Sequence, residues 1–119
     1  MLNFCTLFDI NFTTQGVAMY ESLKAVCSDF HLYIFAFCDD SYDLLNKLNL
    51  ENVTVISMNE LEDEALLQVK PTRTQGEYCW TCSSSTIKYC LEKFNLDHCT
   101  YIDADIYFYS NPKVLFDEM

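Results

Sequence analysis

The apolar run at residues 31–38, with the sequence HLYIFAFC, constrains the fold of this chain more than any other segment. A strand with one face in water alternates apolar and polar residues, whereas a strand covered on both faces is apolar nearly throughout. Strands of the second kind occur almost only in parallel sheets that are packed between layers of helices. The run therefore predicts an α/β fold.

Two kinds of segment alternate along the sequence. Stretches that predict strands lie at residues 3–8, 31–38, 53–57 and 99–108, and helical spacing of apolar residues lies at 15–27, 42–48, 59–69 and 77–94. We expect Thr13 or Thr14 to cap the first helix and residues 70–76 to form a loop. This order predicts one domain over residues 1–119, a Rossmann-like three-layer α/β/α fold with a mostly parallel sheet.

The composition excludes several classes of function. A formal net charge of −11 without a basic patch argues against a nucleic-acid partner, and two glycines are too few for a glycine-rich phosphate loop. No stretch is long and apolar enough to span a bilayer, and no signal peptide precedes the first expected strand. Seven cysteines, most of them in apolar segments, predict buried thiols and a reducing, cytoplasmic setting.

Two carboxylates, Asp103 and Asp105, interrupt the apolar run at residues 99–108. Burying an unpaired carboxylate is costly, so two of them within a strand need a partner. Residues at positions i and i+2 of a strand point to the same face, where both carboxylates could bind one hard cation such as Mg²⁺ or Mn²⁺. The alternative is a strand that ends in a solvated acidic turn.

Polar residues also follow the other expected strands. Asp9 and Asn11 come after the first strand, and Asp39 and Asp40 after the second. Ligands of parallel α/β sheets bind at the carboxyl ends of the strands, so these residues are candidates for a binding site.

The Asp103-Ala104-Asp105 motif, followed by Pro112 and the Leu115-Phe116 pair, resembles the D-x-D region of GT-A-type glycosyltransferases. The stretch from Asp9 through Asn11 and Phe12, with a Ser22-Leu23 pair late in the next helix, is similar to the nucleotide loop and first helix of the family-8-like branch. The resemblance covers essentially the whole chain.

The resemblance implies the nucleotide-binding half of a metal-dependent hexosyltransferase that uses a UDP- or GDP-sugar donor and an unknown acceptor. Asp103 and Asp105 would then hold Mn²⁺ or Mg²⁺, Asp9 and Asn11 would hydrogen-bond the base, and Phe12 would pack against it. Asp40 would be a weaker candidate for the base or ribose.

The sequence departs from the family pattern in two places. The family usually has an Arg or Lys in the helix before D-x-D, near the sugar donor, whereas residues 83–86 are neutral here and Lys88 is the cation nearest to them. The sequence also ends 14 residues after Asp105 (119 − 105), so we expect an incomplete GT-A fold. The alternatives are a non-catalytic binding or interaction module, which could pair with a second copy, and a phosphatase that uses D-x-D as nucleophile and acid.

Overall fold

A four-stranded, entirely parallel sheet in the order β3-β2-β1-β4 forms the centre of the protein. The structure is a computed structural model that describes residues 2–27, 29–62, 64–72 and 74–103. The strands are β1 (Leu2–Phe8), β2 (Phe30–Ala36), β3 (Val53–Ser57) and β4 (Thr100–Tyr101). The predicted α/β class and parallel sheet are confirmed, and the fold is Rossmann-like.

The two central strands pair along their full length, from Leu2 opposite Phe30 to Phe8 opposite Ala36. Strand β3 pairs with β2 from Val53 opposite Leu32 to Ser57 opposite Ala36, and β4 pairs with β1 through Thr100 opposite Phe4. Every residue of β2 except His31 is buried, as the apolar run predicted for a strand covered on both faces.

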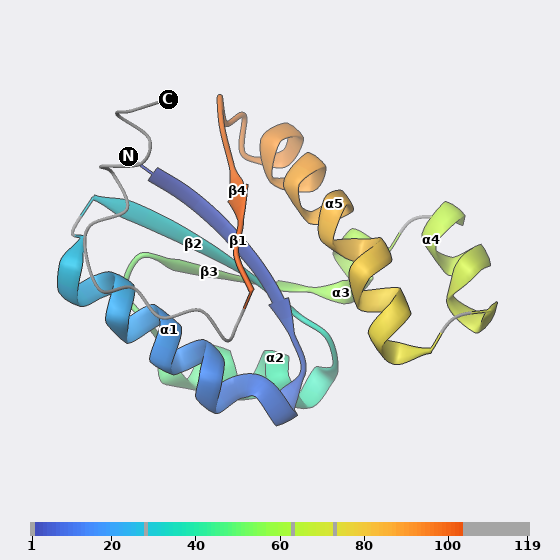
Figure 1. Cartoon of the computed structure of the whole chain (residues 1–119), viewed down its shortest axis with the longest axis horizontal. Helices are drawn as coiled ribbons and strands as arrows, with labels where there is room; N and C mark the ends of the chain where they lie inside the picture. Colours follow the sequence, from blue (N-terminus) through green and yellow to red (C-terminus); the bar gives the residue numbers. More distant parts are fainter. Residues whose placement is uncertain (1, 28, 63, 73, 104–119) are drawn as a thin grey trace.

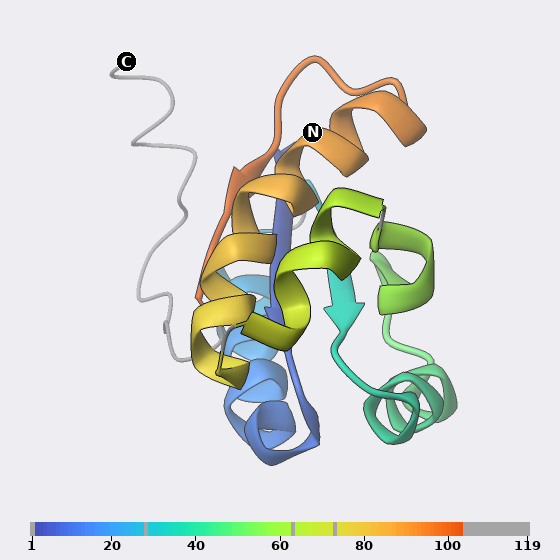
Figure 2. The same ribbon diagram turned by 90° about the vertical axis from the view of Figure 1, so that its right-hand side faces the viewer.

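Helices cover both faces of the sheet (Figures 1 and 2). On one face, α1 (Thr13–Val26) and α2 (Asp39–Leu48) pack on a core that includes Phe4, Phe8 and Ile34. On the other face, α3 (Met58–Leu61), α4 (Glu64–Val69) and α5 (Gln75–Lys93) pack on a core that includes Leu7 and Phe35. The three-layer arrangement is therefore also as predicted.

Three local predictions were wrong. The segment predicted as one helix over 59–69 forms two helices, α3 and α4. The predicted loop over 70–76 contains the 3-10 turn η2 (Lys70–Thr72), and α5 already begins at Gln75 because Thr74 caps it. Helix α1 has Phe12 at its N-cap, because the preceding 3-10 turn η1 (Ile10–Phe12) runs directly into the helix.

Of the run predicted as a strand over 99–108, the structure describes residues 99–103, and β4 comprises two of these. Among the described residues, no helix has the length and apolar character needed to cross a membrane.

Candidate functional site

The strand order places a topological switch point between β1 and β4. From β1 the chain moves outward through β2 to β3, and it then returns to the opposite side of β1 as β4. In open α/β sheets, ligands bind in the crevice outside the carboxyl ends of the strands at such a point. Asp9 follows the carboxyl end of β1, and Asp103 lies two residues beyond β4.

The turn after β1 is held by the side chain of Asp9. Its Oδ1 accepts a hydrogen bond from the Asn11 backbone N–H at 2.9 Å, and its carbonyl oxygen accepts one from the Phe12 N–H at 3.1 Å. These bonds close the 3-10 turn η1 and fix the direction of the carboxylate. A short polar side chain directly after a strand is suited to this task because it can bond its own following backbone.

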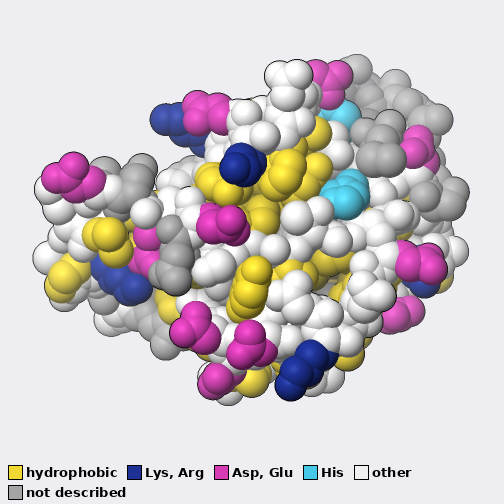
Figure 3. All heavy atoms as spheres, turned by 180° about the vertical axis from the view of Figure 1, so that it is seen from behind, with side chains coloured by type: hydrophobic (Ala, Val, Ile, Leu, Met, Phe, Trp, Pro, Cys, Tyr) yellow, Lys and Arg dark blue, Asp and Glu magenta, His cyan; other side chains and the backbone are white. Residues whose placement is uncertain are grey.

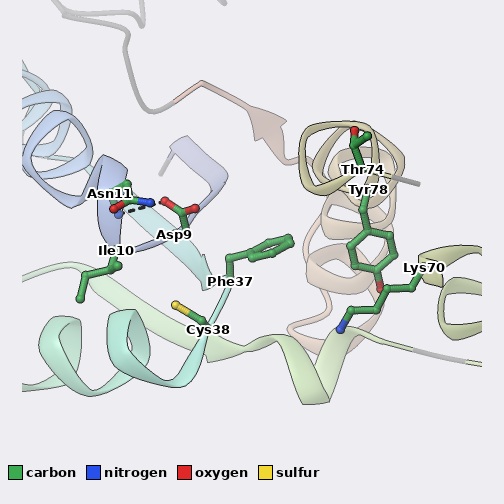
Figure 4. Close-up of a pocket in the computed structure, with 8 residues that line it drawn as sticks. All are labelled: Asp9, Ile10, Asn11, Phe37, Cys38, Lys70, Thr74 and Tyr78. Atoms are coloured by element: carbon green, nitrogen blue, oxygen red, sulfur yellow. Dashed lines mark hydrogen bonds between the residues drawn. The ribbon is translucent and has the colours of Figure 1, made fainter. Parts of the chain in front are cut away.

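A cavity of about 490 Å³ opens beside this turn (Figure 4). Its walls come from the end of β1, the end of β2, the η2 turn and the start of α5. The lining residues are Asp9, Ile10, Asn11, Phe37, Cys38, Lys70, Thr74 and Tyr78. Figure 4 shows the Asp9 and Asn11 side chains on one side, Lys70 and Tyr78 on the other, and the Phe37 ring between them. A cavity of this size can hold a nucleotide-sized ligand.

A buried carboxylate organises the wall formed by η2 and α5. Glu62 Oε2 accepts a hydrogen bond from Lys70 Nζ at 2.9 Å and another from the Tyr78 hydroxyl at 2.6 Å. Lys70 Nζ also lies 5.4 Å from the centre of the Tyr78 ring, within the range of a cation–π contact. The Glu62 side chain is only 7% exposed, so its charge is balanced by Lys70 rather than by water.

Tyr78 stays protonated in this network. Burial is the main cause that raises the pKa of the Tyr78 hydroxyl. The hydrogen bond to Glu62 raises this pKa further, because the hydroxyl must keep its proton in order to donate it. The phenol is therefore a fixed hydrogen-bond donor to Glu62.

The predicted nucleoside residues are partly brought together by the fold. Asp9 and Asn11 line the cavity, as expected for residues at a strand end. Phe12 and Asp40 are exposed and are not among the lining residues; Phe12 is 51% exposed at the start of α1, and Asp40 lies in the first turn of α2.

Asp103 is exposed and follows a short stretch held against β1, where the Ile102 N–H donates to the Cys5 carbonyl at 2.9 Å. Asp105, its predicted partner in holding a metal, lies outside the described residues. The structure therefore describes one of the two predicted metal ligands, Asp103, close to the end of β4.

Sequence reasoning missed the wall of the cavity that lies over the sheet. Lys70 is the lining cation among the described residues, whereas Lys88, the cation nearest to the neutral stretch 83–86, is an exposed residue outside the lining. Tyr78 is both buried in the core, with 2% of its surface exposed, and part of the lining. In the sequence, the Lys70-Pro71 pair before the longest helix indicates a turn. It does not indicate that this turn packs over the sheet and forms a wall of the cavity.

No protein-family model matches the chain. It is 34% identical over 115 residues to "Uncharacterized protein YfnF" of Bacillus subtilis strain 168, an alignment that covers 96% of the chain and 38% of the relative. It is 32% identical over 117 residues to "Uncharacterized protein YfnD" of the same strain, which covers 98% of the chain and 38% of that relative. The chain thus spans well under half the length of these two relatives.

Proposed function

We propose that this chain is the nucleotide-sugar-binding region of a metal-dependent GT-A-type glycosyltransferase. The observation that carries the proposal is a cavity lined by Asp9 and Asn11 at the carboxyl end of β1. Strand β1 is one of the two strands that flank the switch point, and the other, β4, leads to Asp103. This is the region in which an open parallel sheet binds nucleotides.

The polar groups at the end of β1 suit a base that carries an imide-type N–H. A carboxylate only accepts hydrogen bonds, and an amide both donates and accepts. Uracil and guanine present a ring N–H together with a carbonyl oxygen, so Asp9 and Asn11 match a UDP- or GDP-sugar. Phe12, exposed in the adjoining turn, supplies an aromatic face for the base.

The charges around the cavity support a bound divalent cation. Among the described residues that line the cavity, Lys70 is the cation, and it already forms an ion pair with Glu62. A nucleoside diphosphate brings further negative charge to a chain of net charge −11. Carboxylate oxygens such as those of Asp103 and Asp105 are the ligands that Mg²⁺ and Mn²⁺ prefer. When bound, such an ion neutralises the charge that develops on a departing diphosphate.

The proposal also includes the reaction, hexosyl transfer, and the cytoplasm as its cellular location. Hexosyl transfer to an acceptor would be an activity of the longer protein, because the chain spans 38% of each relative. A reducing, cytoplasmic setting is supported by the free thiols of Cys5, Cys27, Cys38, Cys90 and Cys99.

Calorimetric titration of the chain with UDP and with GDP, with and without Mn²⁺, tests the proposal. We expect binding of one nucleotide per chain that tightens at least about tenfold with Mn²⁺, and we expect Asp103→Ala to abolish this metal effect. Glu92→Gln is the matched control, since Glu92 is exposed on α5 and lies about 21 Å along the helix axis from Tyr78.

Asp9→Asn tests the base site without disturbing its turn. The amide oxygen can still accept the Asn11 N–H, so the turn should persist while the negative charge is lost. We expect nucleotide binding to weaken by roughly 1.5–3 kcal/mol, as for a lost hydrogen bond to a charged group. Absence of metal-dependent nucleotide binding, with an unchanged profile for Asp103→Ala, would refute the glycosyltransferase proposal. Binding without any sugar transfer by the longer protein would favour the non-catalytic module.

A further inference from the structure

Three cysteines that are far apart in the sequence meet on the α5 side of the sheet. Cys5 lies in the middle of β1, Cys90 lies in the last turn of α5, and Cys99 directly precedes β4. Their Sγ atoms all lie within 4.8 Å of one another. None of the three lines the nucleotide cavity, so this thiol cluster is a separate feature of the molecule.

The distances match what a thiophilic ion requires. Tetrahedral zinc–thiolate bonds of 2.3 Å separate the sulfur atoms by about 3.8 Å, so the cluster would need to contract by at most about 1 Å. The side chains of Cys5 and Cys90 are fully buried, whereas Cys99 is only partly buried and leaves a route from solvent. Three protein ligands leave a fourth position for water, as zinc permits.

The thiols of the cluster shift one another's pKa values through hydrogen bonds. Hydrogen bonds from Cys90 and Cys99 lower the pKa of Cys5, and the burial of Cys5 opposes this shift. The hydrogen bond to Cys5 and burial raise the pKa of Cys90 in turn. The three sulfur atoms thus converge within the reach of one ion, and each thiol binds a metal once it has lost its proton.

We propose that Cys5, Cys90 and Cys99 form a structural binding site for a thiophilic d¹⁰ ion such as Zn²⁺. Binding replaces the thiol protons by the ion, so up to three protons are released and the affinity increases with pH. The ion would join the central strand β1, the end of α5 and the segment before β4. It would thereby fix the strand that leads to Asp103 against the sheet.

Titration of the reduced, metal-free full chain with Zn²⁺, in competition with a chromophoric chelator, tests the site. We expect one tightly bound ion per chain and a rise in the thermal unfolding midpoint. Cys99→Ser is the preferred variant because Cys99 is the least buried of the three. It should weaken Zn²⁺ binding at least 100-fold, since even changes outside the ligand shell cost roughly 10–100-fold.

Two cysteines serve as matched controls. Cys27 is buried on the opposite face of the sheet and Cys38 is exposed, so Cys27→Ser and Cys38→Ser should bind Zn²⁺ as the parent chain does. Titration with Co²⁺ adds a spectroscopic readout that does not depend on stability, since thiolate ligation produces a sulfur-to-cobalt charge-transfer band. That band should be present in the parent chain and both controls and reduced in Cys99→Ser.

Equal Zn²⁺ affinity in Cys99→Ser and the parent chain would overturn the proposal, as would the absence of a charge-transfer band. A disulfide between two of the three cysteines that persists in the metal-free protein after treatment with a thiol reductant, detected by peptide mass mapping, would also overturn it.

Discussion

At the scale of single residues, Gly16 determines how closely α1 approaches the sheet. A Cβ atom added at this position would lie 2.5 Å from Cζ and 2.6 Å from Cε1 of the Phe8 ring. The ring is 3% exposed and packed in the core, so it has little room to move. Glycine is therefore present for packing at a position where helix propensity alone would favour alanine.

Gly16→Ala should destabilise the protein for this reason. In a helix, alanine raises the free energy of unfolding by about 1 kcal/mol relative to glycine. Overpacking a filled core lowers it, typically by about 1–3 kcal/mol. Because the overlap with Phe8 is severe, we expect a net loss of roughly 1–2 kcal/mol in the free energy of unfolding, measured by urea denaturation. The neighbouring exposed Gln15→Ala should change stability by less than about 0.5 kcal/mol. A more stable Gly16→Ala would show that Phe8 moves aside without cost.

Cys38 is the exposed thiol of the cavity lining and should be the most reactive of the cysteines whose exposure the structure describes. The side-chain hydroxyl of Ser41, which lies 3.5 Å from Sγ, lowers the pKa of Cys38, and the Ser41 backbone N–H contributes to the same shift. A lowered pKa means that the thiolate persists to lower pH. The rate of alkylation by iodoacetamide should therefore reach half its maximum below pH 9.0, the value of an unperturbed thiol. Ser41→Ala should move this midpoint upward, as followed by peptide mass mapping across a pH series.

The same reaction reports on the occupancy of the cavity. With UDP and Mn²⁺ at nine-tenths saturation, alkylation of Cys38 should slow about tenfold, because only the free protein exposes the thiol. Cys99 is partly buried and lies outside the cavity lining, so its alkylation is the internal control and should not slow. Equal slowing of both residues would indicate general stabilisation rather than ligand contact.

At the scale of elements, the start of α5 is fixed by a reciprocal capping box. Thr74 Oγ1 accepts the Glu77 N–H at 3.2 Å, and Glu77 Oε1 accepts the Thr74 N–H at 2.8 Å. This cap places Tyr78 within reach of Glu62, so it also shapes the cavity wall. Thr74→Ala should lower the free energy of unfolding by about 1 kcal/mol. Ser84→Ala, at an exposed position in the same helix, should instead leave stability unchanged or slightly raised, because alanine is the better helix former.

The elements that could be predicted from the sequence are those with a strong local pattern. Strand β3 was predicted with its observed bounds, and the apolar run of β2 correctly indicated burial on both faces. Helix boundaries were less predictable, because they depend on caps such as Thr74 and on the turn held by Asp9.

Some residues of the candidate site could likewise be predicted from the sequence, and others could not. Asp9 and Asn11 could be predicted because they follow a strand directly, whereas Lys70 reaches the cavity only through the packing of η2 and α5 over the sheet. The thiol cluster could not be predicted either, since Cys5 and Cys90 lie 85 positions apart in the sequence (90 − 5) and meet only when α5 packs on β1.

At the scale of the whole molecule, electrostatic repulsion opposes the binding of any anionic ligand. The chain carries 18 acidic and seven basic residues, and Figure 3 shows the acidic side chains distributed over the face that it presents. The potential of such a surface extends over about 10 Å at 0.1 M salt and further at lower ionic strength. The one described cation of the cavity lining, Lys70, is already paired with Glu62 and adds little to offset this repulsion.

Nucleotide affinity in the absence of divalent ions should therefore increase with salt. Raising NaCl from about 10 to about 150 mM should tighten UDP binding by roughly two- to fivefold, because screening reduces long-range repulsion more than it weakens local contacts. Calorimetry at the two salt concentrations measures the effect. Asp43→Asn combined with Glu92→Gln changes two exposed residues outside the cavity lining and reduces the net charge to −9 (−11 + 2), so it should make the salt dependence shallower. An affinity that falls as salt rises would contradict the prediction, because it would mean that Lys70 leaves Glu62 and that direct contact with the phosphates outweighs the field of the whole chain.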